Sequence, residues 1–383
     1  MMEVILVRSC HLRGDSRSIK MIADYVARDF RVTPLVWTRG VDGDLPSHAV
    51  AFRRRGLQGK KFHNVYYFLR WHIFLFWFLI RNANRRFILH TVDFDTALVT
   101  VPMARLFGKS VVYDGFDHFA SSREGAFASL FDKVERFLVR QADILILPDE
   151  TRVDQYGLKK GDVRICVIAN MPDMAQLEVA YGKGEATPEV GPIHIVYVGT
   201  LEAKHRGLEF IPRLCEAFPG RVRFTVGGNG ALDSFFDGHA ARLPNLRYIG
   251  YQPYKDALRV MMNSDVLYGP YLLSSKNHPF AAPNKMFEHL ALGRPLITNE
   301  GTPPGRFVQE NGTGYIFDGS YESLNAIVST LVRSDARSRG DLARKLWLER
   351  YSHLREDQVA AFFGELDIVL KRYGQAQSRP VPP

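Results

Sequence analysis

Short apolar segments alternate with amphipathic segments along almost the whole chain. The apolar segments are rich in valine, isoleucine and leucine, and most lack the polar alternation of a half-exposed strand. This is typical of strands that are buried on both faces of a parallel sheet. Apolar residues at helical spacing, as in 16–27, separate them. The pattern therefore predicts an α/β fold with parallel sheets. The predicted strands are 3–7, 87–91, 109–114, 143–148, 163–168, 222–226, 246–250, 265–268, 295–298 and 314–317, and the segment 193–207 is expected to open the second domain.

A break in this pattern divides the chain into two series of strands and helices. Residues 181–191 contain few apolar side chains, as interdomain linkers commonly do. A chain of 383 residues is also long enough for two domains with separate cores. We therefore expect a first domain over 1–172, a linker over 173–191 and a second domain over 192–350.

The overall composition is that of an ordinary globular protein, with 46% hydrophobic and 24% charged residues. The three cysteines have no metal-binding spacing and are odd in number, which fits a reducing compartment better than a zinc site. The N-terminus enters a strand pattern directly, without a signal peptide, so a cytoplasmic protein is expected. The net charge of +9 indicates an anionic partner. No nucleic-acid motif is visible, and a membrane surface or a phosphorylated substrate is favoured.

One segment, 283–298, carries the strongest chemical signal. Its apolar residues predict a helix that ends at Gly293 and is followed by a short strand. Lys285 and Glu288 project from the same side of the first turn, where free N–H groups favour an anion. A nucleoside diphosphate needs this combination, because its phosphates pair with a cation and its ribose hydroxyls donate to a carboxylate. The alternative is an ordinary helix with a surface ion pair.

This segment resembles the donor-binding signature of GT-B glycosyltransferases, family 4 in particular, in which Lys-x-x-Glu is followed by Ala-x-Gly-x-Pro. The resemblance implies two doubly wound Rossmann-like domains that face each other across a cleft. It also implies that Glu288 binds the donor ribose and Lys285 the diphosphate, with Asn284 beside them. In such enzymes the last helix, here 351–373, packs back on the first domain. The tail 374–383, rich in proline and glutamine, is expected to be disordered.

A second donor segment is expected around residues 197–207. Family 4 enzymes usually have Tyr-x-Gly-Arg-Leu and, three residues later, Lys-Gly. Here Thr200 replaces the arginine and the segment is one residue longer. Arg206 best matches the lysine, and Lys204 is the alternative. The family also has a second glutamate eight residues before the one matched by Glu288. Phe280 occupies that position here, so retention or inversion of the anomeric configuration stays open.

The catalytic candidates follow the strand at 109–114. Family 4 enzymes commonly have His-Glu where this chain has Phe116 and Asp117. The layout is also similar to that of bacterial inverting glucuronosyltransferases of exopolysaccharide synthesis, in which an aspartate at the position of Asp117 is the general base. A carboxylate at the end of a parallel strand can face the cleft and accept the proton of an acceptor hydroxyl. His118 is the competing base, and a loop-capping role for both residues is the alternative.

Two further segments of the first domain are polar. The loop 9–17 joins a strand to a helix, where phosphates commonly bind, and Arg13, Gly14 and Ser16 are its candidate contacts for an acceptor or a phosphate. A surface arginine is the alternative for Arg13. The triplet 93–95 is a literal Asp-x-Asp, but we expect it to cap a helix. No metal or other cofactor is therefore expected.

An aromatic, leucine-rich run at 65–80 is flanked by basic clusters. The run is too short to span a bilayer and is interrupted by Arg70 and His72. Such a helix suits partial insertion at an anionic leaflet, although a core helix is the alternative. The expected membrane contacts are Arg54, Lys60, Lys61, Trp71, Phe74 and Trp77.

Together these features predict a glycosyltransferase, of hexosyl or glycuronosyl type, that acts at the inner face of the plasma membrane. Its acceptor is expected to be a lipid-linked glycan of bacterial surface polysaccharide synthesis. A non-catalytic two-domain ligand-binding protein is the first alternative, and the lack of a secretion signal argues against it. An NAD-dependent oxidoreductase is the second, and no Gly-x-Gly-x-x-Gly follows a strand to support it.

Overall fold

The computed structural model of the chain consists of two compact units. It describes residues 1–12, 15–41, 43, 45–54, 61–122, 128–159, 161–181 and 190–377. Unit 1 comprises Met1–Ala169 together with Glu356–Pro383, and unit 2 comprises Asn170–Arg355. Each unit has its own sheet, helices and core, so the two are described separately.

Unit 1 is built on a seven-stranded sheet in which every pair of neighbours is parallel. The strand order is β3-β2-β1-β4-β5-β6-β7, so β1 lies between β2 and β4 and the order reverses there. The strands are β1 (Glu3–Arg8), β2 (Arg31–Trp37), β3 (Val50–Phe52), β4 (Phe87–Val92), β5 (Ser110–Asp114), β6 (Ile144–Leu147) and β7 (Arg164–Val167). In such sheets ligands bind beyond the carboxyl ends of the strands, next to the point of reversal.

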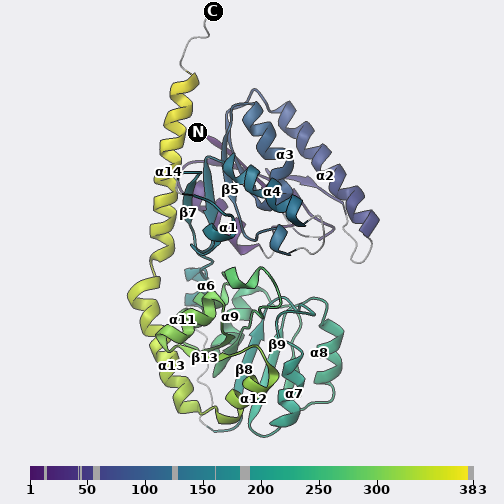
Figure 1. Ribbon diagram of the computed structural model, residues 1–383, viewed down its shortest axis with the longest axis vertical. Helices are drawn as coiled ribbons and strands as arrows, with labels where there is room; N and C mark the ends of the chain where they lie inside the picture. Colours follow the sequence, from purple (N-terminus) through teal and green to yellow (C-terminus); the bar gives the residue numbers. More distant parts are fainter. Residues whose placement is uncertain are drawn as a thin grey trace, which may run out of the picture. The chain divides into compact units, whose positions relative to one another are not determined.

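Helices cover both faces of this sheet (Figure 1). On one face, α2 (Lys61–Arg81), α3 (Asp93–Leu106) and α4 (Ala128–Arg140) share an apolar core with the strands. On the other face, α1 (Ser16–Val26) and the last helix, α14 (Leu354–Gln377), pack together through Tyr25 and Phe362, whose ring centroids are 5.9 Å apart. Two short helices, η1 (Ala120–Ser122) and α5 (Arg152–Gln155), lie in the loops after β5 and β6.

Unit 2 repeats the same plan with a six-stranded parallel sheet of order β10-β9-β8-β11-β12-β13. Its strands are β8 (Ile193–Val198), β9 (Val222–Gly227), β10 (Leu246–Tyr248), β11 (Val266–Tyr268), β12 (Leu296–Asn299) and β13 (Gly314–Phe317). Its helices are α6 (Met174–Tyr181), α7 (Phe210–Ala217), α8 (Asp233–Ala240), α9 (Tyr254–Met262), η2 (His278–Phe280), α10 (Lys285–Leu292), α11 (Pro303–Asn311), α12 (Tyr321–Thr330), α13 (Arg333–Leu346) and a π-helical turn at Trp347–Tyr351. The order reverses between β8 and β11.

The predicted α/β class with two doubly wound sheets is confirmed. Two details differ from the prediction. Residues 174–181 of the expected linker form α6, which packs within unit 2: Leu177 is buried and the Tyr181 hydroxyl donates to the carbonyl oxygen of Ala291. Residues 182–189 of the expected linker lie outside the described part of the chain. Disorder was expected from residue 374 onward, but α14 continues to Gln377. Residues 378–383 are outside the described part.

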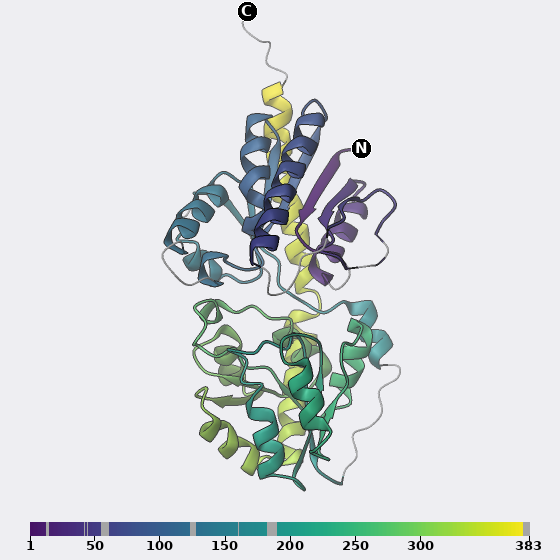
Figure 2. The ribbon, with the colours of Figure 1, turned by 90° about the vertical axis from the view of Figure 1, so that its right-hand side faces the viewer.

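The aromatic run at 65–80 forms most of α2, which lies beside α3 (Figure 2). Trp71 is fully buried and packs against Trp37, Phe52 and Phe74 at ring-centroid distances of 5.7–6.2 Å. Trp71 is therefore a core residue, and its prediction as a membrane contact is wrong. The reason is the helical period, since one stripe of the aromatic run faces the sheet.

The other side of α2 is apolar and exposed. Its exposed large side chains are Val65, Tyr66, Leu69, Ile73, Phe76, Trp77 and Ile80. Phe74 is half-buried and Arg54 is exposed. Lys60 and the side chain of Lys61 lie outside the described part. No described helix combines the length and apolar character needed to cross a membrane.

The two tryptophans of α2 offer a direct test of this assignment. We expect Trp71→Ala to lower the free energy of unfolding by about 3–5 kcal/mol, because it removes a large buried ring and leaves a cavity. Trp77→Ala, at a position where the side chain is 53% exposed, should change it by less than about 0.5 kcal/mol. Denaturant titration of both variants measures the difference. Equal losses would contradict the assignment of Trp71 to the core.

Candidate functional site

In unit 2, the predicted donor residues lie at the carboxyl ends of β8 and β11, where the strand order reverses. Lys285, at the start of α10, is buried and donates from Nζ to the carbonyl oxygen of Val198, the last residue of β8. The ammonium also lies 4.7 Å from the centroid of the Tyr197 ring. A Cβ at Gly269 would come within 2.8 Å of the Lys285 side chain. The residue after β11 therefore has to be glycine for the lysine to reach β8.

Arg206 and Glu288 lie close to Lys285. Arg206 donates to Glu202 at 2.9 Å and its guanidinium stacks 4.1 Å from the centroid of the Tyr271 ring. Glu288 is buried on the first turn of α10. The structure therefore brings together the three residues that the sequence proposed for diphosphate and ribose, although Arg206 and Glu288 lie 82 positions apart in the chain.

The remaining donor candidates differ in their surroundings. Asn284 is half-buried and precedes α10 without forming a side-chain capping bond. Thr200 and Lys204 are both exposed in the segment after β8. Arg206, in contrast, is held by its hydrogen bond to Glu202 and by the Tyr271 ring. This favours Arg206 over Lys204 as the counterpart of the family's lysine.

Burial lowers the pKa of Lys285 to about 8, and nearby Arg206 adds to this effect while Glu288 opposes it. The amine of Lys285 thus changes its charge close to neutral pH. A bound anion would stabilise the charged form and raise the pKa again. Binding of a phosphate would therefore increase the protonated fraction of Lys285 near neutral pH.

In unit 1, the two predicted catalytic residues follow β5 but lie in different environments. The Asp117 side chain is 63% exposed and accepts a hydrogen bond of 3.0 Å from Arg152 Nη2. His118 is buried, with Nδ1 2.8 Å from Ser121 Oγ and Nε2 3.2 Å from Asp132. Burial lowers the pKa of His118 to about 4. The structure therefore favours Asp117 over His118 as a group that can meet a substrate.

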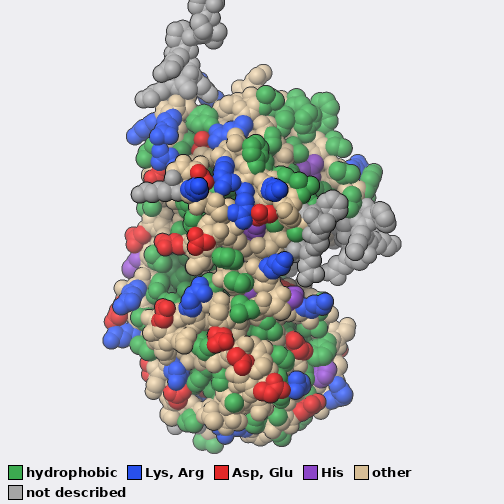
Figure 3. Space-filling view, in the orientation of Figure 1, with side chains coloured by type: hydrophobic (Ala, Val, Ile, Leu, Met, Phe, Trp, Pro, Cys, Tyr) green, Lys and Arg blue, Asp and Glu red, His purple; other side chains and the backbone are tan. Residues whose placement is uncertain are grey.

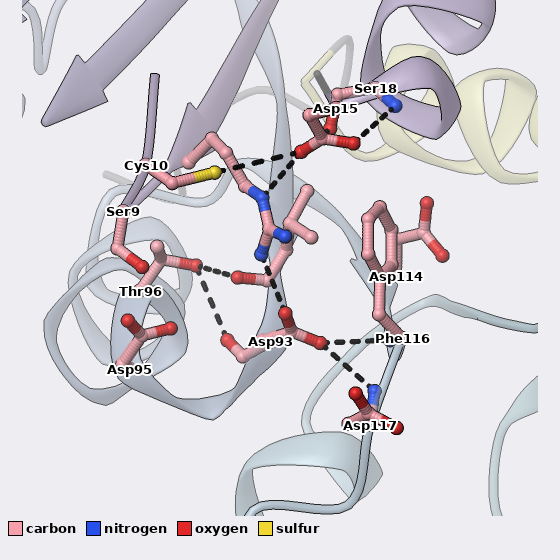
Figure 4. A network of polar contacts seen from close by, with 12 residues as sticks. Ser9, Cys10, Asp15, Ser18, Asp93, Asp95, Thr96, Asp114, Phe116 and Asp117 are labelled. Atoms are coloured by element: carbon pink, nitrogen blue, oxygen red, sulfur yellow. Dashed lines mark hydrogen bonds and ion pairs between the residues drawn. The ribbon is translucent and has the colours of Figure 1, made fainter. Parts of the chain in front are cut away.

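A half-buried polar network that the sequence did not predict lies beside Asp117 (Figure 4). Asp93 follows β4 directly, and its Oδ1 accepts from the backbone N–H groups of Phe116 (2.8 Å) and Asp117 (3.3 Å). Its Oδ2 pairs with Arg8 at 2.6 Å, and Arg8 also pairs with Asp15 at 2.7 Å. The prediction that Asp93 caps α3 is wrong, since no side-chain capping bond forms there.

A second buried pair lies near this network. Arg17 of α1 donates to Asp114 at 2.8 Å and to the carbonyl oxygen of Ile168 at 2.6 Å. Its guanidinium also lies 5.0 Å from the centroid of the Phe116 ring. Of the predicted phosphate-loop residues, Ser16 is half-buried at the start of α1. Arg13 and Gly14 are outside the described residues.

No group of three or more His, Cys, Asp or Glu side chains with metal-binding geometry occurs among the described residues. The donor residues of unit 2 supply cations instead. Cations of this kind can pair with the oxygens of a diphosphate.

Part of the chain matches a known protein family. Residues 192–334, most of unit 2, match the family model described as Glycosyl transferases group 1. The succinoglycan biosynthesis protein ExoL of Rhizobium meliloti (strain 1021) is 24% identical over 152 residues. That match covers 38% of this chain and 38% of ExoL.

Solved structures show the same fold over almost the full chain. Alr3699/HepE of Anabaena, solved in complex with UDP-glucose, has a TM-score of 0.66 at 14% identity, covering 95% of this chain and all of that one. WaaG, a glycosyltransferase involved in lipopolysaccharide biosynthesis, has a TM-score of 0.64 at 14% identity, covering 94% and 98%. The E. coli trehalose-6-phosphate protein bound to UDP-2-fluoro glucose has a TM-score of 0.67 at 12% identity, covering 95% and 98%.

These findings confirm the resemblance on which the sequence analysis relied. The chain has the GT-B fold, with two Rossmann-like domains, and its second domain matches a glycosyltransferase family.

The charge state of Lys285 can be tested through protein stability. The folded state lowers the pKa of this amine from its ordinary 10.5 to about 8. Unfolding therefore takes up a proton between these values, and the free energy of unfolding should rise from pH 8 to pH 10.5, by roughly 3 kcal/mol at most. Lys285→Met should remove that rise, whereas Lys276→Met, at an exposed lysine, should keep it. Urea titrations at several pH values measure the slope. The same slope in wild type and Lys285→Met would contradict the lowered pKa.

Proposed function

We propose that this protein is a glycosyltransferase that moves a sugar from a nucleotide-sugar donor to a lipid-linked glycan acceptor. The observation that carries the proposal is the cluster of Lys285, Arg206 and Glu288 at the point of reversal in unit 2. Two cations and a carboxylate, gathered from two distant segments, match the diphosphate and the ribose of such a donor.

The donor is proposed to be a uridine nucleotide sugar. HepE is described with UDP, UDP-glucose and glucose, and the E. coli neighbour with a UDP-sugar analogue. Lys285 and Arg206 would neutralise the diphosphate as it leaves, and no metal ion is required for that role. Their charge is present before the reaction, so it would stabilise the leaving group without rearrangement.

The proposed reaction transfers the sugar with Asp117 as general base. The acceptor oxygen forms the new bond to the anomeric carbon, the bond from that carbon to the diphosphate breaks, and Asp117 accepts the hydroxyl proton. Inversion of configuration is the favoured outcome. Phe280, a half-buried apolar residue of η2, occupies the position of the second glutamate found in retaining relatives of family 4.

The acceptor proposal rests on α2 and on the roles of similar proteins. Exposed apolar side chains of α2 gather on the surface drawn in Figure 3. Arg81 at the end of the helix is exposed, as is Arg85 after it. ExoL is described as acting in succinoglycan biosynthesis and WaaG in lipopolysaccharide biosynthesis. We infer a role in bacterial surface polysaccharide synthesis, at the inner face of the plasma membrane.

The donor proposal predicts that UDP raises the melting temperature of the protein, because a ligand that binds only the folded state stabilises it. Glu288→Gln should lose most of this shift, since the amide also donates where the ribose needs only an acceptor. Glu310→Gln, at an exposed glutamate on α11, is the matched control. A thermal-shift series with UDP, GDP, ADP, dTDP, CMP and NAD measures the response.

Turnover separates the proposed enzyme from its rivals. Release of UDP from a UDP-sugar, reduced at least about a hundredfold by Asp117→Asn, is expected for a general base. Binding of UDP without any turnover would favour a ligand-binding protein. A response to NAD alone would favour an oxidoreductase and end the glycosyltransferase proposal.

Membrane contact through α2 predicts binding to vesicles that contain anionic phospholipid. Replacing Ile73 and Trp77 together by serine should weaken binding at least about tenfold, because two exposed apolar side chains no longer enter the lipid. Sedimentation with phosphatidylglycerol vesicles, and with neutral phosphatidylcholine vesicles for comparison, measures the affinity. Unchanged sedimentation of the double variant would contradict this role of α2.

A further inference from the structure

We propose that Asp93 is a positioning residue of the transfer reaction, whose carboxylate holds the backbone of Phe116 and Asp117 and so fixes the place of the general base. This inference rests on the proposed function, because it takes Asp117 as the base. Asp93 itself does not touch a substrate in this role. It acts through the two backbone N–H groups whose hydrogen bonds it accepts.

Both carboxylate oxygens of Asp93 accept hydrogen bonds. Oδ1 accepts from the N–H groups of Phe116 and Asp117 at 2.8 and 3.3 Å, and Oδ2 accepts from Arg8 at 2.6 Å. Figure 4 shows the carboxylate pointing from the end of β4 toward the loop that carries Asp117. A carboxylate whose two oxygens both accept hydrogen bonds from the protein is suited to holding other groups in place rather than to accepting a proton from a substrate.

Further contacts hold the same loop. Gly115 N–H donates to the carbonyl oxygen of Ile146 at 2.9 Å. The Phe116 ring lies 4.6 Å from the guanidinium of Arg8 and 5.0 Å from that of Arg17. The backbone of Phe116 is thus held by Asp93 while its ring is covered by two cations. The loop has few ways to move without breaking one of these contacts.

Arg8 links this loop to the other strands of the sheet. It is the last residue of β1, and it pairs with Asp93 after β4 and with Asp15 before α1. Asp15 in turn accepts from the backbone N–H of Ser18 and caps α1. The segments after β1, β4 and β5 are therefore joined by one chain of charged contacts at the carboxyl edge of the sheet.

The backbone at Asp93 is itself unusual. Its φ is +64°, a left-handed conformation that side chains other than those of glycine, asparagine and aspartate rarely adopt. This conformation lets α3 begin immediately after β4 and turns the carboxylate toward the loop. Strain of this kind is commonly retained at functional sites. It also limits which substitutions can test the residue cleanly.

The charge of Asp93 adds a signature that a purely structural contact would lack. Burial raises its pKa to about 6, and the charges of Asp95 on α3 and Asp117 contribute in the same direction, whereas Arg8 opposes them. Below pH 6 the carboxylate becomes protonated and its two N–H bonds lose their charge-assisted strength. Turnover should therefore decline as the pH falls through about 6.

Two substitutions keep the left-handed backbone while changing the acceptor. Asp93→Asn keeps one carbonyl oxygen but removes the charge, and Asp93→Gly removes the acceptor altogether. Asp95→Asn is the matched control, because Asp95 lies on the same helix and its nearest cation is Arg39 at 3.5 Å. Hydrogen–deuterium exchange of the peptide that contains Phe116 and Asp117 reports directly on the two bonds.

For Asp93→Gly we expect exchange in that peptide to accelerate at least about tenfold and UDP release from a UDP-sugar to fall by a similar factor. The affinity for UDP should stay within about twofold, since the donor residues belong to unit 2. Asp93→Asn should keep part of the activity and lose the decline near pH 6. Asp95→Asn should match the wild type in exchange and in turnover at neutral pH, and its decline should move to lower pH, because a charge that raises the pKa of Asp93 is removed.

Unchanged exchange in Asp93→Gly, or accelerated exchange with unchanged UDP release, would overturn the positioning role. So would a decline near pH 6 that persists in Asp93→Asn. If Asp117→Asn keeps full activity, or the wild type releases UDP from no UDP-sugar, the proposed function fails and the positioning role fails with it. The exchange data still show in that case whether Asp93 holds the loop.

Discussion

Neighbouring strands in both sheets run parallel, and a parallel pair can be joined only by a crossover that returns the chain to its starting edge. Every strand of a sheet therefore ends at the same edge. Where the strand order reverses, the segments that follow two adjacent strands diverge and leave room for polar side chains. Arg8 and Asp93 occupy that position in unit 1, and Lys285 occupies it in unit 2. The placement of both clusters depends on this single constraint.

Both clusters contain a charged group that burial pushes toward its neutral form. Burial lowers the pKa of Lys285 and raises that of Asp93. Each group has an opposite charge nearby, Glu288 for the lysine and Arg8 for the aspartate, which partly compensates for the loss of water. Desolvated ionisable groups of this kind are costly for stability and are commonly retained where they serve a function.

The sequence allowed the α/β class and the donor segment to be predicted because both depend on local patterns. The strand and helix periods are local, and Lys285 and Glu288 lie on one turn of one helix. Other features depend on contacts that no local pattern encodes. Asp93 was interpreted as a helix cap because an aspartate at the start of a predicted helix commonly has that role. Its partners, Phe116 and Asp117, are more than twenty residues away.

The remaining differences have equally physical causes. Trp71 and Trp77 are six residues apart in one aromatic run, and only packing against the sheet distinguishes the buried ring from the exposed one. The expected linker was extended back to residue 173, although the low-apolar composition begins only at 181 and residues 174–181 form α6. Strand β2 was overlooked, and Pro34 within it removes a backbone donor that strands normally use.

The order of the elements along the chain has a consequence for biosynthesis. Unit 1 is completed by α14, which the ribosome makes only after the whole of unit 2. Until then, the apolar side chains of this face that pack against α14, among them Met21 and Tyr25 of α1, lack that helix. Nascent unit 1 therefore exposes an apolar surface until α14 has been synthesised and has packed against it. Such a surface is a natural target for a chaperone during translation.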